Sequence, residues 1–150
     1  MIAVANEKRV YIICPKLASS TVKANNEEKI AAAKTAYQAQ SNHLLNWEFI
    51  EEDNELYKDG VRIIIHLENE VSFVTFHERG DYIATVSPHP LRANDQVFVH
   101  SLSKGGSQRP FTKSKGNIVQ VAFHPTKPIL FILTHKNVYL FNLQEQVIYD

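Results

Sequence analysis

The segment whose residues could most clearly bind a ligand is a basic run without acidic residues, between residues 101 and 116. Four cations lie there, with an aromatic ring and two polar side chains between them: Lys104, Arg109, Lys113 and Lys115, with Phe111, Ser107 and Gln108. Cationic side chains neutralise nucleic-acid phosphates, and an aromatic ring can stack on an unpaired base. The pattern therefore indicates a candidate RNA-binding segment whose contact residues are Lys104, Arg109, Phe111, Lys113 and Lys115.

The same segment has a second, purely structural interpretation. A connection at the outer edge of a sheet is exposed, and basic side chains there discourage pairing with a neighbouring strand. On the residues alone, this structural interpretation is the stronger of the two.

Other chemistry has little support in the sequence. The seven histidines show no His-Glu-x-x-His spacing, and no Cys-x-x-Cys pair occurs, so no metal site is predicted. Cys14 is the single cysteine and lies among apolar neighbours, where a thiol is usually inert. There is no Gly-x-Ser-x-Gly elbow and no glycine-rich phosphate loop. We therefore expect no enzyme activity, no cofactor and no small-molecule substrate.

The composition is that of one globular unit. The chain has 150 residues, of which 44% are hydrophobic and 21% charged, with a net charge of zero. The charges are segregated, because residues 48–59 are mostly acidic whereas 101–116 are only basic. One cysteine allows no internal disulfide, no basic signal-peptide region is present, and no apolar run approaches about 18 residues. We expect a soluble intracellular domain, or a piece of one, with no membrane partner.

The N-terminal part predicts two short strands and then a helix. Ile2–Asn6 and Arg9–Pro15 are rich in β-branched and aromatic residues. From Asn25 to Trp47 good helix formers dominate, with Asn25 and Glu28 spaced as a capping box. Apolar residues recur there at steps of three and four, so we expect a helix whose stripe packs on its own domain. The acidic run after it is expected to be a solvated loop.

From residue 61 onward the pattern predicts one strand after another. The expected strands are Val61–Leu67, Glu70–His77, Tyr82–Ser87, Gln96–Leu102, Ile118–His124, Ile129–Thr134, Asn137–Leu143 and the start of one more at Gln146–Tyr149. Pro88 and Pro90 make the intervening segment a loop, since proline interrupts a sheet ladder.

These strands form an internal repeat. Phe76-His77 and Phe123-His124 lie 123 − 76 = 47 residues apart. Val71–Ser87 and Ile118–Thr134 then align without a gap as two consecutive strands each. Residues 5–11 likewise overlay residues 133–139. Four-strand units that recur every forty to fifty residues are typical of β-propeller blades.

The predicted fold class is all-β: a WD-repeat-like β-propeller fragment of about three blades with a helical insertion, from a larger, seven-bladed propeller. A lone blade cannot bury its own faces, so a fragment is favoured. The first blade is expected to lack its opening strands and the last to stop after one strand. The expected units are 1–15, part of a blade; 16–60, a helical and acidic insertion; 61–103, a blade; 104–116, the basic inter-blade link; and 117–150, a blade with the start of the next.

Three motifs carry a resemblance to a known family. They are Gly80–Val86 (GDYIATV), then His100–Lys104 leading to Ser107–Phe111, and then Lys113–Gly116 leading to Val121–Pro125. Their order and spacing resemble the C-terminal WD-repeat propeller of the block-of-proliferation family of ribosome biogenesis proteins. The similarity is strong from about Val61 to Leu143.

The chain departs from ordinary WD repeats in its motifs. No Trp-Asp dipeptide occurs, its usual place being held by Phe141-Asn142, and no Gly-His dipeptide occurs either. The buried polar network that usually ties blade to blade is therefore not expected. Packing of the inner strands should replace it, chiefly through Val74, Phe76, Val121 and Phe123.

The resemblance implies a non-catalytic scaffold of the nucleolus and nucleoplasm, acting in biogenesis of the large (60S) ribosomal subunit and in precursor rRNA processing. The implied partners are a pescadillo-type protein, a second WD-repeat protein of the same complex, and the pre-60S particle with its precursor rRNA. The family's N-terminal, pescadillo-binding region and later blades have no counterpart in this sequence. With this family in view, RNA binding by the basic segment and the structural interpretation are equally supported. The alternative function is a WD-repeat adaptor in an unrelated complex, such as one of trafficking or signalling.

Overall fold

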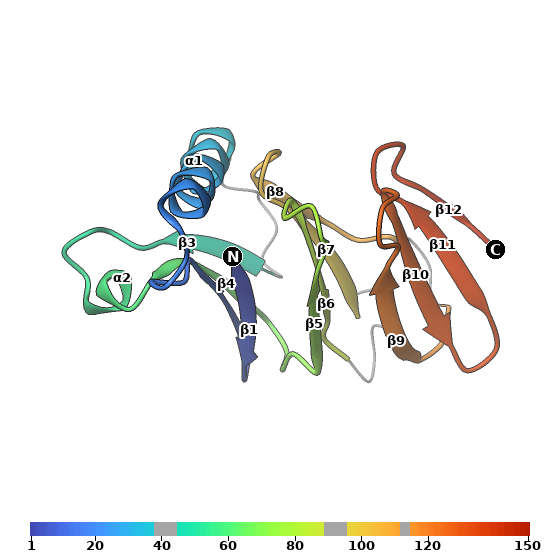
Figure 1. Cartoon of the computed structure of the whole chain (residues 1–150). Coiled ribbons are helices and arrows are strands. Elements are labelled where there is room, and N and C mark those ends of the chain that lie inside the picture. The colour runs from blue at the N-terminus through green and yellow to red at the C-terminus, as the bar shows by residue number, and fades with distance from the viewer. Residues whose placement is uncertain (38–44, 89–95, 112–114) are drawn as a thin grey trace.

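The computed structural model describes residues 1–37, 45–88, 96–111 and 115–150. Its strands form three four-stranded antiparallel sheets that follow one another along the molecule (Figure 1). The first strands of the three sheets lie side by side, with the first strand of the second sheet between the other two (Figure 1). This arrangement confirms the all-β propeller fragment with a helical insertion. No helix within the described residues is long and apolar enough to span a bilayer.

The first sheet contains β1 (Ile2–Asn6), β2 (Arg9–Ile13), β3 (Leu45–Phe49) and β4 (Val61–Leu67). Their spatial order is β1-β2-β4-β3, so β3 forms the outer edge although it precedes β4 in the chain. The tight turn between β1 and β2 places Glu7 at a positive φ of 53°.

In the second and third sheets, strands that follow one another in the chain are also neighbours in the sheet. The second consists of β5 (Phe73–Phe76), β6 (Tyr82–Val86), β7 (Val97–Ser101) and β8 (Gly106–Gln108). The third consists of β9 (Ile118–Phe123), β10 (Ile129–Thr134), β11 (Val138–Asn142) and β12 (Val147–Tyr149). Each neighbouring pair is antiparallel, as expected for chain segments joined by short turns.

These pairings correct three boundaries expected from the sequence. Val61–Leu67 pairs with β2 and β3, and therefore completes the first sheet instead of opening the second. Part of the basic segment is β8, the fourth strand of the second sheet. Val147–Tyr149 pairs with β11 and is the fourth strand of the third sheet, not the start of another blade. The short edge strands β8 and β12 are defined by their partners more than by their own sequence. The sheet to which the longer, internal strand β4 belongs is set by its pairing with β2 and β3, which lie earlier in the chain.

The predicted helix is shorter and begins earlier. Helix α1 (Ser20–Ala36) starts at Ser19, whose hydroxyl accepts a hydrogen bond from the Val22 amide at 3.3 Å. Residues 38–44 of the predicted helix lie outside the described part of the chain. Trp47 belongs to β3, where residues 45, 47 and 49 share one face with the period of a strand. A second, short helix, α2 (Glu55–Lys58), lies within the acidic run of residues 48–59, which was expected to be a solvated loop.

Two apolar cores lie between neighbouring sheets. The first joins the first and second sheets and includes Ile30 and Ala33 of α1, which confirms that this part of the helical stripe packs on its own domain. The second joins the second and third sheets. Of the inner-strand residues expected to bind the blades together, Val74 and Phe76 pack against the first core. Val121 and Phe123 pack in the second.

A buried polar chain also links the first two sheets, contrary to the expectation that packing alone would do so. The indole Nε1 of Trp47 on β3 donates to Ser107 Oγ on β8 at 2.9 Å. Ser107 Oγ lies 2.6 Å from His100 Nδ1, and His100 Nε2 lies 2.9 Å from Thr85 Oγ1. The network is built without Trp-Asp or Gly-His dipeptides, because its members come from four separate strands.

Candidate functional site

The basic segment begins in a turn that Asp81 holds in place. The Asp81 carboxylate accepts hydrogen bonds from the Ser103 amide at 2.8 Å and from the hydroxyls of Ser103 and Ser101 at 3.0 and 3.2 Å. Lys104 follows directly and is exposed. The hydrogen bonds that Asp81 accepts in the preceding turn therefore fix the backbone position of Lys104.

Gly105 brings this turn against the end of α1. It has a positive φ of 57°, and a Cβ atom added there would lie 2.5 Å from the Tyr37 amide nitrogen and 2.7 Å from the Ala36 carbonyl carbon. Only glycine combines this backbone conformation with so close an approach. The basic segment thus contributes to docking the helix, in addition to any ligand contact.

The cations of the segment lie at the surface where they are described. Lys104, Arg109 and Lys115 are all exposed. The Lys115 ammonium lies 5.5 Å from the centre of the Tyr139 ring, within cation–π range. Lys113 falls outside the described residues. Of the four cations predicted to bind phosphates, the three within the described residues are therefore accessible to solvent.

The position of Phe111 contradicts the hypothesis that its ring stacks on an RNA base. Its side chain is 3% exposed and belongs to the core between the second and third sheets. The ring packs edge-on against Tyr139, with 5.3 Å between ring centres. A base cannot stack on a ring that is already enclosed, so Phe111 anchors the crossing between sheets and the RNA hypothesis loses its aromatic platform.

The network around His100 is structural. Burial lowers the pKa of His100 to about 3, so the imidazole is neutral near pH 7. The indole can only donate, so Ser107 Oγ accepts from Trp47 and can donate its own proton to His100 Nδ1. In the tautomer with the proton on Nε2, His100 donates to Thr85 Oγ1. Each side chain of the network is hydrogen-bonded to another member of it, which indicates a structural role and not a ligand-binding one.

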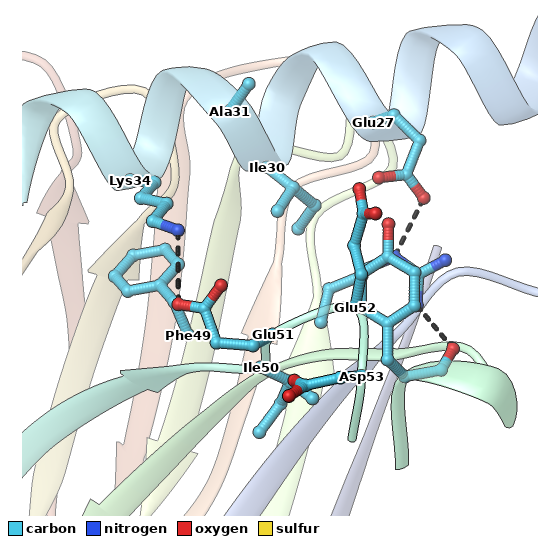
Figure 2. Close-up of a pocket in the computed structure, with 11 residues that line it drawn as sticks. Glu27, Ile30, Ala31, Lys34, Phe49, Ile50, Glu51, Glu52 and Asp53 are labelled. Atoms are coloured by element: carbon cyan, nitrogen blue, oxygen red, sulfur yellow. Dashed lines mark hydrogen bonds and ion pairs between the residues drawn. The ribbon is translucent and has the colours of Figure 1, made fainter. Parts of the chain in front are cut away.

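A second site, missed from the sequence, lies where α1 crosses the outer part of the first sheet. Figure 2 shows Glu27, Ile30 and Lys34 directed from α1 toward the side chains of residues 49–53. The cleft between them has a volume of about 660 Å³. The acidic run was expected to be a solvated loop, and only the position of the helix opposite it makes a cleft.

Two ion pairs join the parts of this cleft. Arg62 Nε donates to Glu27 Oε1 at 2.8 Å, and its guanidinium carbon lies 3.5 Å from the centre of the Tyr57 ring. Lys34 Nζ lies 3.5 Å from Glu51 Oε1 across the opening (Figure 2). These contacts tie the helix to β4 and to the loop after β3.

The described residues offer little other chemistry. Among them, no three His, Cys, Asp or Glu side chains gather closely enough to hold a metal ion. Cys14 is 5% exposed, and burial raises the pKa of its thiol, which disfavours the reactive thiolate. His77 follows β5 directly, and its Nδ1 accepts a local hydrogen bond from the Arg79 amide. Its Nε2 lies 3.2 Å from the carbonyl oxygen of Lys127, in the turn between β9 and β10, and so contacts the third sheet.

The stacked four-stranded sheets and their inter-sheet cores define this chain as a segment of a β-propeller. It is 41% identical over 97% of its length to the ribosome biogenesis protein BOP1 homolog of Aedes aegypti, and 36% identical over 97% to that of Drosophila melanogaster. It is 35% identical over 97% of its length to the ribosome biogenesis protein bop1-A of Xenopus laevis. The chain belongs to the BOP1 family, the block-of-proliferation family that its motifs resemble.

The chain spans only a small part of these relatives. It covers 17% of the Aedes aegypti protein, 18% of the Drosophila melanogaster protein and 19% of the Xenopus laevis protein. No protein-family model matches the chain.

Proposed function

We propose that this chain acts in ribosome biogenesis, as a non-catalytic scaffold in assembly of the large (60S) subunit and processing of its precursor rRNA. The observation that carries the proposal is its identity of 35–41% over 97% of its length with proteins named for ribosome biogenesis. The propeller architecture agrees with it, because stacked sheets offer broad, rigid surfaces for partners. Fold alone would not have selected this function.

The scaffold role requires partners. By the family resemblance these are a pescadillo-type protein, a second WD-repeat protein and the pre-60S particle, met in the nucleolus and nucleoplasm. The segregated charges support contacts of both signs, since the acidic 48–59 region and the basic 101–116 region lie on separate parts of the chain.

We further propose that the basic segment contacts precursor rRNA through its charges alone. Lys104, Arg109 and Lys115 are exposed, and Lys113 belongs to the same run. Their role would be to bind phosphates without reading sequence, because Phe111 is enclosed in the core. The segment would then serve both RNA contact and the docking of α1.

The scaffold proposal is tested by expressing the tagged chain in insect cells. We expect nucleolar fluorescence and copurification with large-subunit precursors and the pescadillo-type protein. Copurification with a trafficking or signalling complex, without pre-ribosomal particles, would overturn the proposal in favour of the adaptor alternative.

The RNA proposal is tested by replacing Lys104, Arg109, Lys113 and Lys115 with Glu. Binding to precursor rRNA should weaken, and the slope of log affinity against log salt should fall by about 0.7 for each lost phosphate contact. The matched control reverses four exposed lysines elsewhere, at positions 8, 16, 23 and 136. Equal losses in the two variants would show that only overall charge matters and would reject the segment as the binding site.

A further inference from the structure

The cleft beside α1 combines an apolar wall with uncompensated negative charge. Phe49 and Tyr57 line it as half-buried rings, and Ile30 and Ile50 lie behind at 8% and 7% exposure. Its volume of about 660 Å³ is within the range of ligand pockets and large enough for several side chains. A binding partner could therefore bury an apolar side chain against this wall.

The charges around this apolar wall do not cancel. Four carboxylates line the cleft, those of Glu27, Glu51, Glu52 and Asp53, against only two cations, Lys34 and Arg62. Both cations are already engaged, Lys34 with Glu51 and Arg62 with Glu27. Within the described part of the chain, no ion pair or hydrogen bond engages the side chains of Glu52 and Asp53, both of which are exposed.

The position of these carboxylates is set by the fold. The Ile50 amide donates to the Arg62 carbonyl at 2.9 Å, which fixes the chain just before residues 51–53. Asn54 then caps α2, with its side chain accepting from the Leu56 amide at 2.9 Å. Residues 51–53 are therefore held between two fixed points, and Figure 2 shows them opposite the helix. The negative charge is presented on a defined structure beside the apolar wall.

We propose that this cleft binds a short, extended peptide segment of a partner protein that carries lysine or arginine residues around two large apolar anchors. The cations of the peptide would compensate Glu52 and Asp53, and the anchors would cover Phe49 and Tyr57. The same charges repel RNA phosphates, so the cleft and the basic segment would select opposite kinds of partner. This proposal stands independently of the ribosomal function, because it rests on the cleft alone.

The test measures fluorescence anisotropy of the complete chain with a labelled heptapeptide, KRLKFRK, and with its variant KRSKSRK, which lacks the apolar anchors. Peptide KRLKFRK should bind, and loss of both anchors should weaken binding at least about fivefold, since buried apolar area contributes beyond charge. Equal affinity of the two peptides would overturn the proposal, because it would indicate attraction by charge only.

Two variants of the chain test the cleft from opposite directions. E52K/D53K should weaken peptide binding at least about tenfold, because two attractions become repulsions. K34E should strengthen it, because it removes a cation and releases Glu51 from its ion pair. None of the three positions is in a core, and circular dichroism of each variant should match that of the original chain.

The matched control is E28K/E70K, which makes the same charge change at exposed sites that do not line the cleft. Its affinity should stay within about twofold of the original chain. An equal loss in E28K/E70K and E52K/D53K would overturn the proposal. So would a single-stranded RNA of equal charge number that competes with the peptide and loses binding in E52K/D53K.

Discussion

Trp47 and Ser107, sixty positions apart in the chain, are joined by a hydrogen bond of 2.9 Å from the indole Nε1 to the hydroxyl oxygen. The bond connects the outer strands of the first and second sheets. Trp47 also stacks on Tyr37 at the end of α1, with ring centres 5.7 Å apart. One side chain therefore contacts the insertion, its own sheet and the next sheet.

Replacing Ser107 by Ala should destabilise the fold by about 1–3 kcal/mol, because it leaves the Trp47 donor and the His100 Nδ1 atom unsatisfied in a buried site. Urea denaturation followed by tryptophan fluorescence measures the change. S20A, at an exposed position of α1, is the control and should change the stability little. A loss of similar size in both variants would contradict the network's structural role.

His100 should make stability depend on pH in the acid range. Its pKa is about 3 in the folded chain, against an ordinary value of 6.5. The unfolded chain therefore takes up the proton first, and the contribution of this group is complete above pH 6.5 and lost as pH falls toward 3. The slope should not exceed about 1.4 kcal/mol per pH unit. Urea midpoints between pH 7.5 and 4 should fall less steeply for H100Q; an unchanged slope would refute this assignment.

A comparison of Gly105 with Gly116 separates two contributions to stability, the contact with α1 and the backbone strain of a positive φ. Both have positive φ, at 57° and 93°, but only Gly105 faces the backbone of α1 closely, while nothing lies within 4 Å of a Cβ added to Gly116. G116A should therefore cost only the conformational term, about 1–2 kcal/mol. G105A should cost clearly more and should reduce the helical signal in circular dichroism. Equal costs would show that α1 does not depend on this contact.

Phe111 should behave as a core residue in every assay. F111A should destabilise the chain by about 3–5 kcal/mol, as expected for loss of a buried aromatic ring. Any effect on RNA binding should disappear when it is measured at a temperature where the variant is still folded. A folded F111A variant that binds RNA poorly would restore the stacking hypothesis.

Cys14 should react slowly with a thiol-specific disulfide reagent in the native chain. It is 5% exposed, and burial raises the pKa of its thiol. The reaction should accelerate strongly in denaturant, where the thiol is exposed and its ordinary pKa is restored. Reaction at the same rate in both conditions would contradict its burial.

The sequence was most informative where structure is local. The succession of strand-like runs from residue 61 onward predicted β6, β9 and β10, and the spacing of Phe76-His77 and Phe123-His124 predicted repeated sheets. These patterns depend on neighbours in the chain, and the structure confirms them. The family motifs were informative for the same reason, since they are short and contiguous.

Features that depend on distant residues could not be predicted in this way. Phe111 stands in a polar run and is enclosed only because Tyr139 packs against it from another sheet. The His100 network draws one residue from each of four strands and has no local signature. The cleft requires α1 to lie opposite the acidic run, which neither segment specifies alone.

The strand order β1-β2-β4-β3 has a consequence for how the chain folds. The second and third sheets are successions of neighbouring strands, so their pairings need only short loop closures. Pairing of β2 with β4 must instead wait until the chain has closed around α1 and β3, at a larger entropic cost. The inserted segment therefore makes the first sheet the slow step of assembly. The amides of β2 that bond to β4, as opposed to those that bond to β1 in the local hairpin, should gain protection from hydrogen exchange after the amides of β6 and β10.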